Sequence, residues 1–129
     1  MNLVSTTIRA FVPGGRDYAR SKAFYEALGF TMTFDAGEVA GFRHGNCEFL
    51  LQNFYTEEFA GNFMMQLLVE DLDAWWAHIA SMDLSARFGV PAPRPPAIQP
   101  WGLRVAYIVD PSGILWHVAQ RRPNTEHDQ

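Results

Sequence analysis

The feature that most constrains the fold of this chain is an internal duplication. A strand, a helix and three further strands are predicted over about residues 6–52, and the same order returns over about residues 63–120. A linker, residues 53–62, separates the two copies. One such unit covers only one face of its sheet with its helix, so the other face must be buried elsewhere or form a pocket. The 129 residues therefore predict a single α+β domain built from two βαβββ units.

Glycine, proline and aspartate set the limits of the predicted elements. Gly29 ends the first helix, and Asp71 is placed to cap the second. The proline-rich segment 90–99 is predicted to be a loop, because proline cannot join the interior of a sheet. A polar tail is expected over residues 121–129. The predicted strands are 6–12, 30–35, 40–44, 48–52, 63–69, 86–90, 103–109 and 114–119, and the predicted helices are 17–28 and 71–82.

Composition argues against several classes of function. The net charge of −4 disfavours nucleic-acid binding, which needs clustered Lys and Arg, but is compatible with a cationic ligand. We expect no membrane span and no signal peptide, because the sequence has neither a long apolar run nor a basic, apolar N-terminal pattern. With Cys47 as the one cysteine, neither an internal disulfide nor a CxxC zinc site can form. The single cysteine fits a reducing compartment, so a cytoplasmic protein is expected.

Three segments, DYARSKAFYEALGF, VEDLDAWW and DPSGILWHVA, carry a resemblance to a known family. In this order they resemble the first helix, the start of the second helix and the last hairpin of the glyoxalase/bleomycin resistance/dioxygenase (vicinal oxygen chelate) superfamily. The resemblance covers about residues 6–120 and implies tandem βαβββ modules that form a curved mixed sheet around a groove. Residues 98–120, IQPWGLRVAYIVDPSGILWHVAQ, are similar to the C-terminal part of bleomycin resistance proteins. Those proteins are dimers that sequester a cationic glycopeptide drug between their subunits, without catalysis.

The enzymes of this superfamily hold a divalent metal with His, Gln or Glu. The resemblance puts the corresponding positions at Ala10, Met64 and His117. Alanine has no donor atom, and the methionine thioether is a soft ligand that suits hard divalent ions poorly. Glu48 or Gln52 could add one partner to His117, and no HxH or HExxH motif occurs. We therefore predict no metal, no cofactor and no catalytic residue.

His117 and Trp101 each allow a structural and a functional interpretation. His117 is either a strand histidine satisfied by hydrogen bonds or, as the resemblance favours, a residue that lines the groove. Trp101 lies between Pro100 and Gly102, and it is either a loop anchor packed on the sheet or an aromatic wall that stacks on a ligand. The functional interpretation is favoured for both.

Further candidates come from strand alternation and from the resemblance. Met64, Gln66 and Leu68 share one face of a strand, and methionine gives an adaptable binding surface. Gln66 stands where the drug-binding proteins have tryptophan, which argues against bleomycin itself as the ligand. Phe34 matches an aromatic position of those proteins. The predicted ligand-binding set is Trp101, His117, Phe34, Met64, Gln66, Phe42 and Leu68.

Acidic side chains at Asp35, Glu38, Glu48 and 57–58 either rim the groove and attract a cation or are ordinary surface groups. The favoured function is a homodimeric, metal-free protein that sequesters an aromatic or cationic drug-like ligand in a groove between subunits. The alternative is a divergent metal-dependent lyase or dioxygenase of the same superfamily. A third hypothesis is a regulatory subunit with a vestigial groove.

Overall fold

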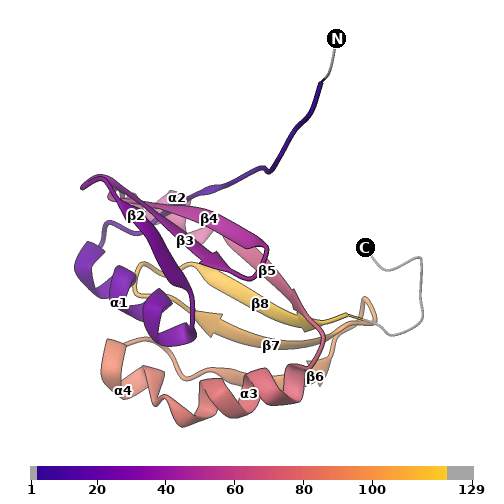
Figure 1. The fold of residues 1–129 in the computed structure, drawn as a ribbon. Coiled ribbons are helices and arrows are strands. Elements are labelled where there is room, and N and C mark those ends of the chain that lie inside the picture. The colour runs from indigo at the N-terminus through magenta and orange to yellow at the C-terminus, as the bar shows by residue number, and fades with distance from the viewer. Residues whose placement is uncertain (1–2, 122–129) are drawn as a thin grey trace.

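The computed structural model describes residues 3–121 as two four-stranded sheets with helices packed against them (Figure 1). The first sheet has the order β1-β4-β3-β2 and consists of β1 (Phe11–Pro13), β2 (Thr31–Asp35), β3 (Val39–His44) and β4 (Cys47–Gln52). The second has the order β5-β8-β7-β6 and consists of β5 (Met64–Val69), β6 (Arg94–Ile98), β7 (Arg104–Val109) and β8 (Leu115–Gln120). In each sheet the first strand of the repeat pairs parallel with the last. The predicted tandem βαβββ architecture is confirmed, as two separate mixed sheets.

The helices begin and end where capping residues satisfy their free backbone groups. They are α1 (Tyr18–Leu28), α2 (Glu57–Gly61), α3 (Leu72–Ser81) and α4 (Leu84–Phe88). The Asp17 carboxylate accepts the Arg20 N–H at the start of α1, and Asp71 accepts the Ala74 N–H at the start of α3. Gly29 ends α1 with φ +112°, a left-handed conformation that favours glycine. No helix within residues 3–121 is long and apolar enough to cross a bilayer.

The first strand is shorter than the sequence predicts. Backbone pairing with β4 extends back only to Ala10, whose carbonyl accepts the Leu50 N–H at 2.9 Å. The segment before Ala10 leads away from the body of the protein (Figure 1) and forms no strand, so most of the predicted strand 6–12 has no neighbouring strand in this chain. Alternating side chains favour a strand, but a strand needs a partner for its N–H and C=O groups. The predicted polar tail lies outside the described residues from 122 onward.

The third strand of the second repeat is also not where the sequence predicts it. Residues 86–90, predicted as a strand, lie mostly within helix α4, which Gly89 ends at φ +69°. The strand is instead β6, formed by part of the proline-rich segment that we predicted to be a loop. β6 lies at the edge of its sheet and pairs only with β7, so a residue without an N–H can be accommodated there.

The core joins the two repeats through an aromatic cluster. Tyr25 of α1 is fully buried, and its ring centroid lies 5.7 Å from that of Trp116 on β8 and 4.9 Å from that of Phe49 on β4. Phe30 packs edge-on against both Phe49 and Trp116. Such contacts add to the burial of apolar area, so the repeats form one hydrophobic core.

A buried polar network crosses the same boundary. Asp110, which is 1% exposed, accepts the backbone N–H groups of Ser112 and Ile114 at 2.9 Å. The Tyr25 hydroxyl donates to Asp110 at 2.5 Å and accepts from the Trp116 indole at 2.9 Å. Burial raises the pKa of Asp110 to about 6, although the hydrogen bonds that Asp110 accepts from Tyr25, Ile114 and Ser112 lower it. Burial and the neighbouring carboxylate raise the pKa of Tyr25 well above its usual value. The Asp-Pro-Ser-Gly turn therefore fastens the second repeat to the first.

Candidate ligand-binding face

The second sheet has one face packed against the core and one open face. Helix α3 contacts β6, β7 and β8, and Figure 1 shows it running beneath this sheet. Successive side chains of a strand point to opposite faces, so the buried residues Leu67, Trp116 and Ile108 mark the packed face. Their neighbours Gln66 and His117 therefore lie on the open face, which is where the sequence placed its ligand site.

Strand register aligns one side chain from each strand across this open face. Gln66 of β5 pairs with His117 of β8, His117 pairs with Tyr107 of β7, and Tyr107 pairs with Arg94 of β6. We call these four residues, together with Trp101 above them, the cross-strand row. An amide, an imidazole, a phenol, a guanidinium and an indole are thus brought to one surface.

The members of the cross-strand row touch one another. The Trp101 ring is stacked on His117 at 6.2 Å with an interplanar angle of 26°, and Tyr107 meets His117 edge-on at 4.8 Å. The Arg94 guanidinium lies 5.9 Å from the centroid of the Tyr107 ring. Trp101 remains 52% exposed. Trp101 therefore adjoins the open face as an exposed aromatic surface, rather than being buried in the core as an anchor.

The environment of His117 keeps its imidazole neutral near pH 7. The side chain is half-buried, and this burial lowers its pKa from the usual value. A neutral imidazole has one hydrogen-bond donor and one acceptor and stacks on other planar groups. His117 can therefore line a ligand site without adding a charge to it.

Apolar side chains flank the row. Met64, which is 62% exposed, pairs with Leu115, and Leu68 lies beyond Gln66 on the same face of β5. In the strand register, Gln66 and not Met64 lies beside His117. Within residues 3–121, no three side chains of the His, Cys, Asp or Glu type are grouped to hold a metal ion.

The two predicted phenylalanines of the first repeat lie on the other sheet. Phe42 is 1% exposed and stacks on Phe49, so it is a core residue and its predicted place in a ligand site is wrong for this chain. Alternation along β3 turns Phe42 toward Tyr25 of α1. Phe34 is 42% exposed, and its ring lies over Gly41, where an added Cβ would come within 2.5 Å of it. Gly41 thus leaves room for the Phe34 ring on the surface of the first sheet.

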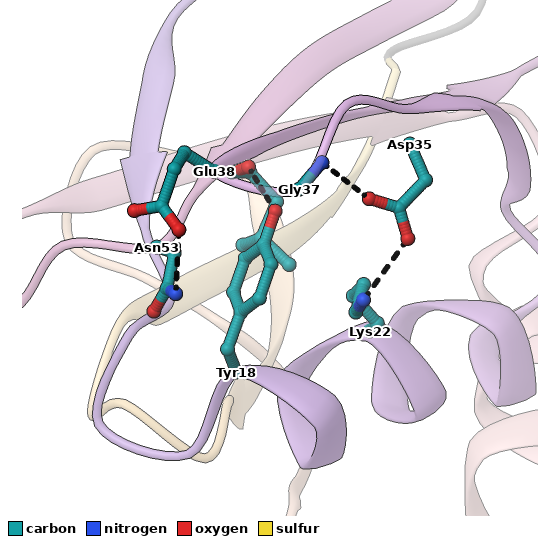
Figure 2. Close-up of polar contacts among 7 residues, drawn as sticks. Tyr18, Lys22, Asp35, Gly37, Glu38 and Asn53 are labelled. Atoms are coloured by element: carbon teal, nitrogen blue, oxygen red, sulfur yellow. Dashed lines mark hydrogen bonds and ion pairs between the residues drawn. The ribbon is translucent and has the colours of Figure 1, made fainter.

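Polar contacts join α1 to β2, which carries Phe34, and to β4 of the same sheet (Figure 2). Lys22 of α1 forms an ion pair with Asp35 at 3.0 Å, and Asp35 also accepts the Gly37 N–H at 3.0 Å. The Tyr18 hydroxyl donates to the Leu51 carbonyl at 3.0 Å. The Gly37 N–H, and after it Lys22, lower the pKa of Asp35, so this carboxylate stays ionised and paired.

Other acidic side chains of the first repeat also have partners. The Asn53 amide donates to Glu38 at 3.4 Å, as Figure 2 shows, and Arg9 lies 3.8 Å from Glu48. Residues 57–58 form the first turn of α2, where negative charge is favoured by the helix dipole. These roles are structural, and none of these groups is on the strands of the second sheet.

Of the cavities formed by residues 3–121, one reaches the row and another lies apart from it. One, of about 380 Å³, adjoins the row at the seam between the sheets and shares Gln66 and Leu68 with the open face. The other, of about 260 Å³, lies between α1 and α3 and is lined by Leu28, Gly29, His44, Ala74, Trp75 and His78. The row itself is an open surface, so one chain does not enclose a ligand there.

Tyr107 and Arg94 are members of the row that the sequence analysis missed. The hairpin around Asp110 could have revealed Tyr107, because pairing across that turn places it opposite His117. Arg94 had no such signal, because its segment resembled a proline-rich loop.

Comparison with known proteins identifies the family. Residues 10–118 match the family model described as the Glyoxalase/Bleomycin resistance protein/Dioxygenase superfamily. The chain belongs to this superfamily. The resemblance stated from the sequence is confirmed over nearly the same residues.

Relatives of this superfamily member include both binding proteins and an enzyme. A bleomycin resistance protein of Klebsiella pneumoniae is 32% identical over 111 residues, which are 81% of this chain and 85% of the relative. The crystal structure of a bleomycin-binding protein complexed with bleomycin has a TM-score of 0.78 and 26% identity, over 92% of this chain and all of that one (100%). A lactoylglutathione lyase from Agrobacterium tumefaciens has a TM-score of 0.64 and 18% identity, over 91% and 95%. The fold is therefore compatible with both binding and catalysis, and the function has to be inferred from the residues of the site.

Proposed function

We propose that this chain is a metal-free binding protein that sequesters a planar aromatic, drug-like molecule on the cross-strand row. The observation that carries the proposal is the run of contacts from Arg94 through Tyr107 and His117 to the exposed ring of Trp101. Flat rings on a solvent-facing surface offer stacking to a flat ligand. The 32% identity to a bleomycin resistance protein supports sequestration as the purpose of this binding.

Binding of this kind needs no catalytic group. Each aromatic stack contributes about 0.5–1.5 kcal/mol beyond the burial of its area, and micromolar affinity needs about −8 kcal/mol. Two stacks, on Trp101 and His117, with burial of Met64 and Leu115, supply energy of this order after the cost of association. Sequestration requires only that the ligand be held.

Of the two ligand properties expected from the sequence, the aromatic one has structural support. The strand residues of the open face bring no carboxylate to the cross-strand row, and Asp35, Glu38 and Glu48 of the first repeat are engaged with other side chains. The proposal therefore rests on stacking, and a cationic ligand is not part of it.

We also propose that a second copy of the chain converts the open face into a groove, in a cytoplasmic homodimer. Large apolar side chains outside the row are exposed in one chain, with Leu3 at 88%, Ile8 at 94% and Phe11 at 52%. Phe34 is exposed on the first sheet and the row lies on the second, and a groove formed between two copies can contain both. Sedimentation velocity should give twice the chain mass, and a monomer at micromolar concentration would contradict this.

The proposal is tested by titration in the presence of EDTA. Isothermal titration calorimetry with metal-free bleomycin and with anionic, neutral and cationic naphthalene probes should give saturable binding of at least one of them without added metal. Metal analysis of protein purified without chelator distinguishes a metal-free binding protein from the alternative, a metal-dependent lyase or dioxygenase. Absence of saturable binding would overturn the proposal, and so would a stoichiometric divalent metal that is lost in His117→Ala.

A further inference from the structure

We infer that the ligand of the cross-strand row carries an anionic group, and that Arg94 binds this group and thereby selects the ligand. The inference rests on the proposed function and adds the charge of the ligand to it. It reverses the cationic ligand that the family resemblance implies.

The first support is the charge of the open face. Each strand of the second sheet contributes one residue to the row, and the side chains are those of Gln66, His117, Tyr107 and Arg94. Gln, Tyr and neutral His can each donate a hydrogen bond, and Arg94 carries the one formal charge of the row. The flanking side chains of Met64 and Leu115 are apolar. A donor-rich strip with a single guanidinium and no carboxylate complements an anion.

The second support is that the Arg94 guanidinium has no ion-pair partner within residues 3–121, unlike that of Arg104 on the adjacent strand. Arg104 at the start of β7 forms an ion pair with Asp73 of α3 at 2.7 Å. Arg94 forms no ion pair with another residue in the range 3–121, and its guanidinium lies over the face of the Tyr107 ring. A guanidinium stacked on an aromatic ring keeps its N–H edge free, and this edge matches the two oxygens of a carboxylate.

The third support is the spacing of the row. Arg94 and His117 are separated by one strand, so they lie about 10 Å apart at the usual strand spacing. A molecule of two fused rings stacked beside Trp101 and His117 can extend a substituent toward Arg94 over this length. We therefore assign the ligand to the class of bicyclic or larger planar aromatics that bear a carboxylate, sulfonate or similar anionic group.

A matched set of probes tests the inference. The probes are 2-naphthoate, neutral 2-naphthamide and cationic 2-naphthylmethylammonium, which share one ring system and differ in charge. At about 0.15 M salt, where long-range effects of the net charge are screened, 2-naphthoate should bind at least about tenfold more tightly than the ammonium probe. In ¹H–¹⁵N NMR spectra, the indole N–H of Trp101 should shift on binding, while that of buried Trp116 should not.

Two variants show whether Arg94 causes the preference. Arg94→Gln should weaken 2-naphthoate about tenfold or more and leave 2-naphthamide nearly unchanged. Arg87→Gln is the matched control, because Arg87 also lies over an aromatic ring, that of Phe88, but on helix α4. It removes the same charge and should change neither affinity.

The outcomes separate this inference from the proposed function. Equal binding of the three probes, tighter binding of the ammonium probe, or a preference that survives Arg94→Gln would overturn the inference and leave an aromatic-binding protein. No saturable binding of any of the three probes or of bleomycin would overturn the proposed function, and the inference with it.

Discussion

Replacing Tyr25 with phenylalanine should lower the free energy of unfolding by about 3 kcal/mol at about pH 8 and by clearly less at about pH 5. The Tyr25 hydroxyl donates to Asp110 Oδ2 and accepts from the Trp116 indole, so its removal takes the hydrogen bond from each of these two buried atoms, while Asp110 Oδ1 keeps those from Ser112 and Ile114. The carboxylate is the costlier of the two, because a buried charge loses more by desolvation than a neutral N–H. Chemical denaturation at both pH values measures the difference.

The sign of this pH dependence follows from Asp110, whose pKa burial raises from 3.8 to about 6. A carboxyl group with a higher pKa in the folded chain stabilises the fold fully below pH 3.8, and the contribution is lost as the pH rises through about 6. The difference between the pKa values of Asp110 in the unfolded and folded chain corresponds to about 3 kcal/mol of free energy. The Tyr25 hydroxyl lowers the pKa of Asp110, so phenylalanine raises it further. At about pH 5 the variant therefore buries a neutral carboxyl, which costs less.

Tyr55→Phe is the control for this experiment. Tyr55 is half-buried against the core, and its hydroxyl makes no hydrogen bond with another residue of the described part of the chain. Its replacement should change stability by less than about 0.5 kcal/mol at either pH. If Tyr25→Phe lost the same stability at both pH values, the role assigned to Asp110 would be wrong.

Replacing Trp101 with alanine should weaken binding of 2-naphthoate roughly thirtyfold, or about 2 kcal/mol, while leaving the fold intact. Truncation removes the exposed ring that is stacked on His117 and that offers its surface to the ligand. Because Trp101 is 52% exposed, its loss should change the free energy of unfolding by less than about 0.5 kcal/mol. Calorimetric titration and thermal denaturation of the same preparation measure the two effects.

Trp101→Phe separates the role of the ring from that of the indole. Phenylalanine keeps a stacking surface, so most of the affinity should remain, but the ligand-induced change in tryptophan fluorescence should be lost. Trp75→Phe provides the reciprocal control, because Trp75 lies against His44 in the cavity between α1 and α3. That variant should keep both affinity and the fluorescence change. Wild-type affinity in Trp101→Ala would place the ligand away from the cross-strand row.

Local chemistry made much of the fold predictable. Capping at Asp17 and Asp71 and termination at Gly29 depend on a few neighbouring backbone groups, and the sequence placed α1 and α3 correctly. It did not predict the short helices α2 and α4. Patterns that need a distant partner were less informative. Residues 6–9 belong to a predicted strand but have no neighbouring strand in the chain, and residues 94–98 are proline-rich yet pair as an edge strand. Backbone pairing is a property of two segments, so one segment's composition cannot decide it.

The sequence by itself determined the duplicated βαβββ order and the family, and it singled out His117 and Trp101 as candidate ligand-binding residues, because order and short motifs are properties of the chain. Only the tertiary structure decided which side chains are neighbours of His117. Register put Gln66 and Tyr107 beside it and added Arg94, while alternation turned Phe42 into the core. A shift of one residue in register exchanges the two faces of a strand, so the composition of a binding face depends on pairing between strands distant in sequence.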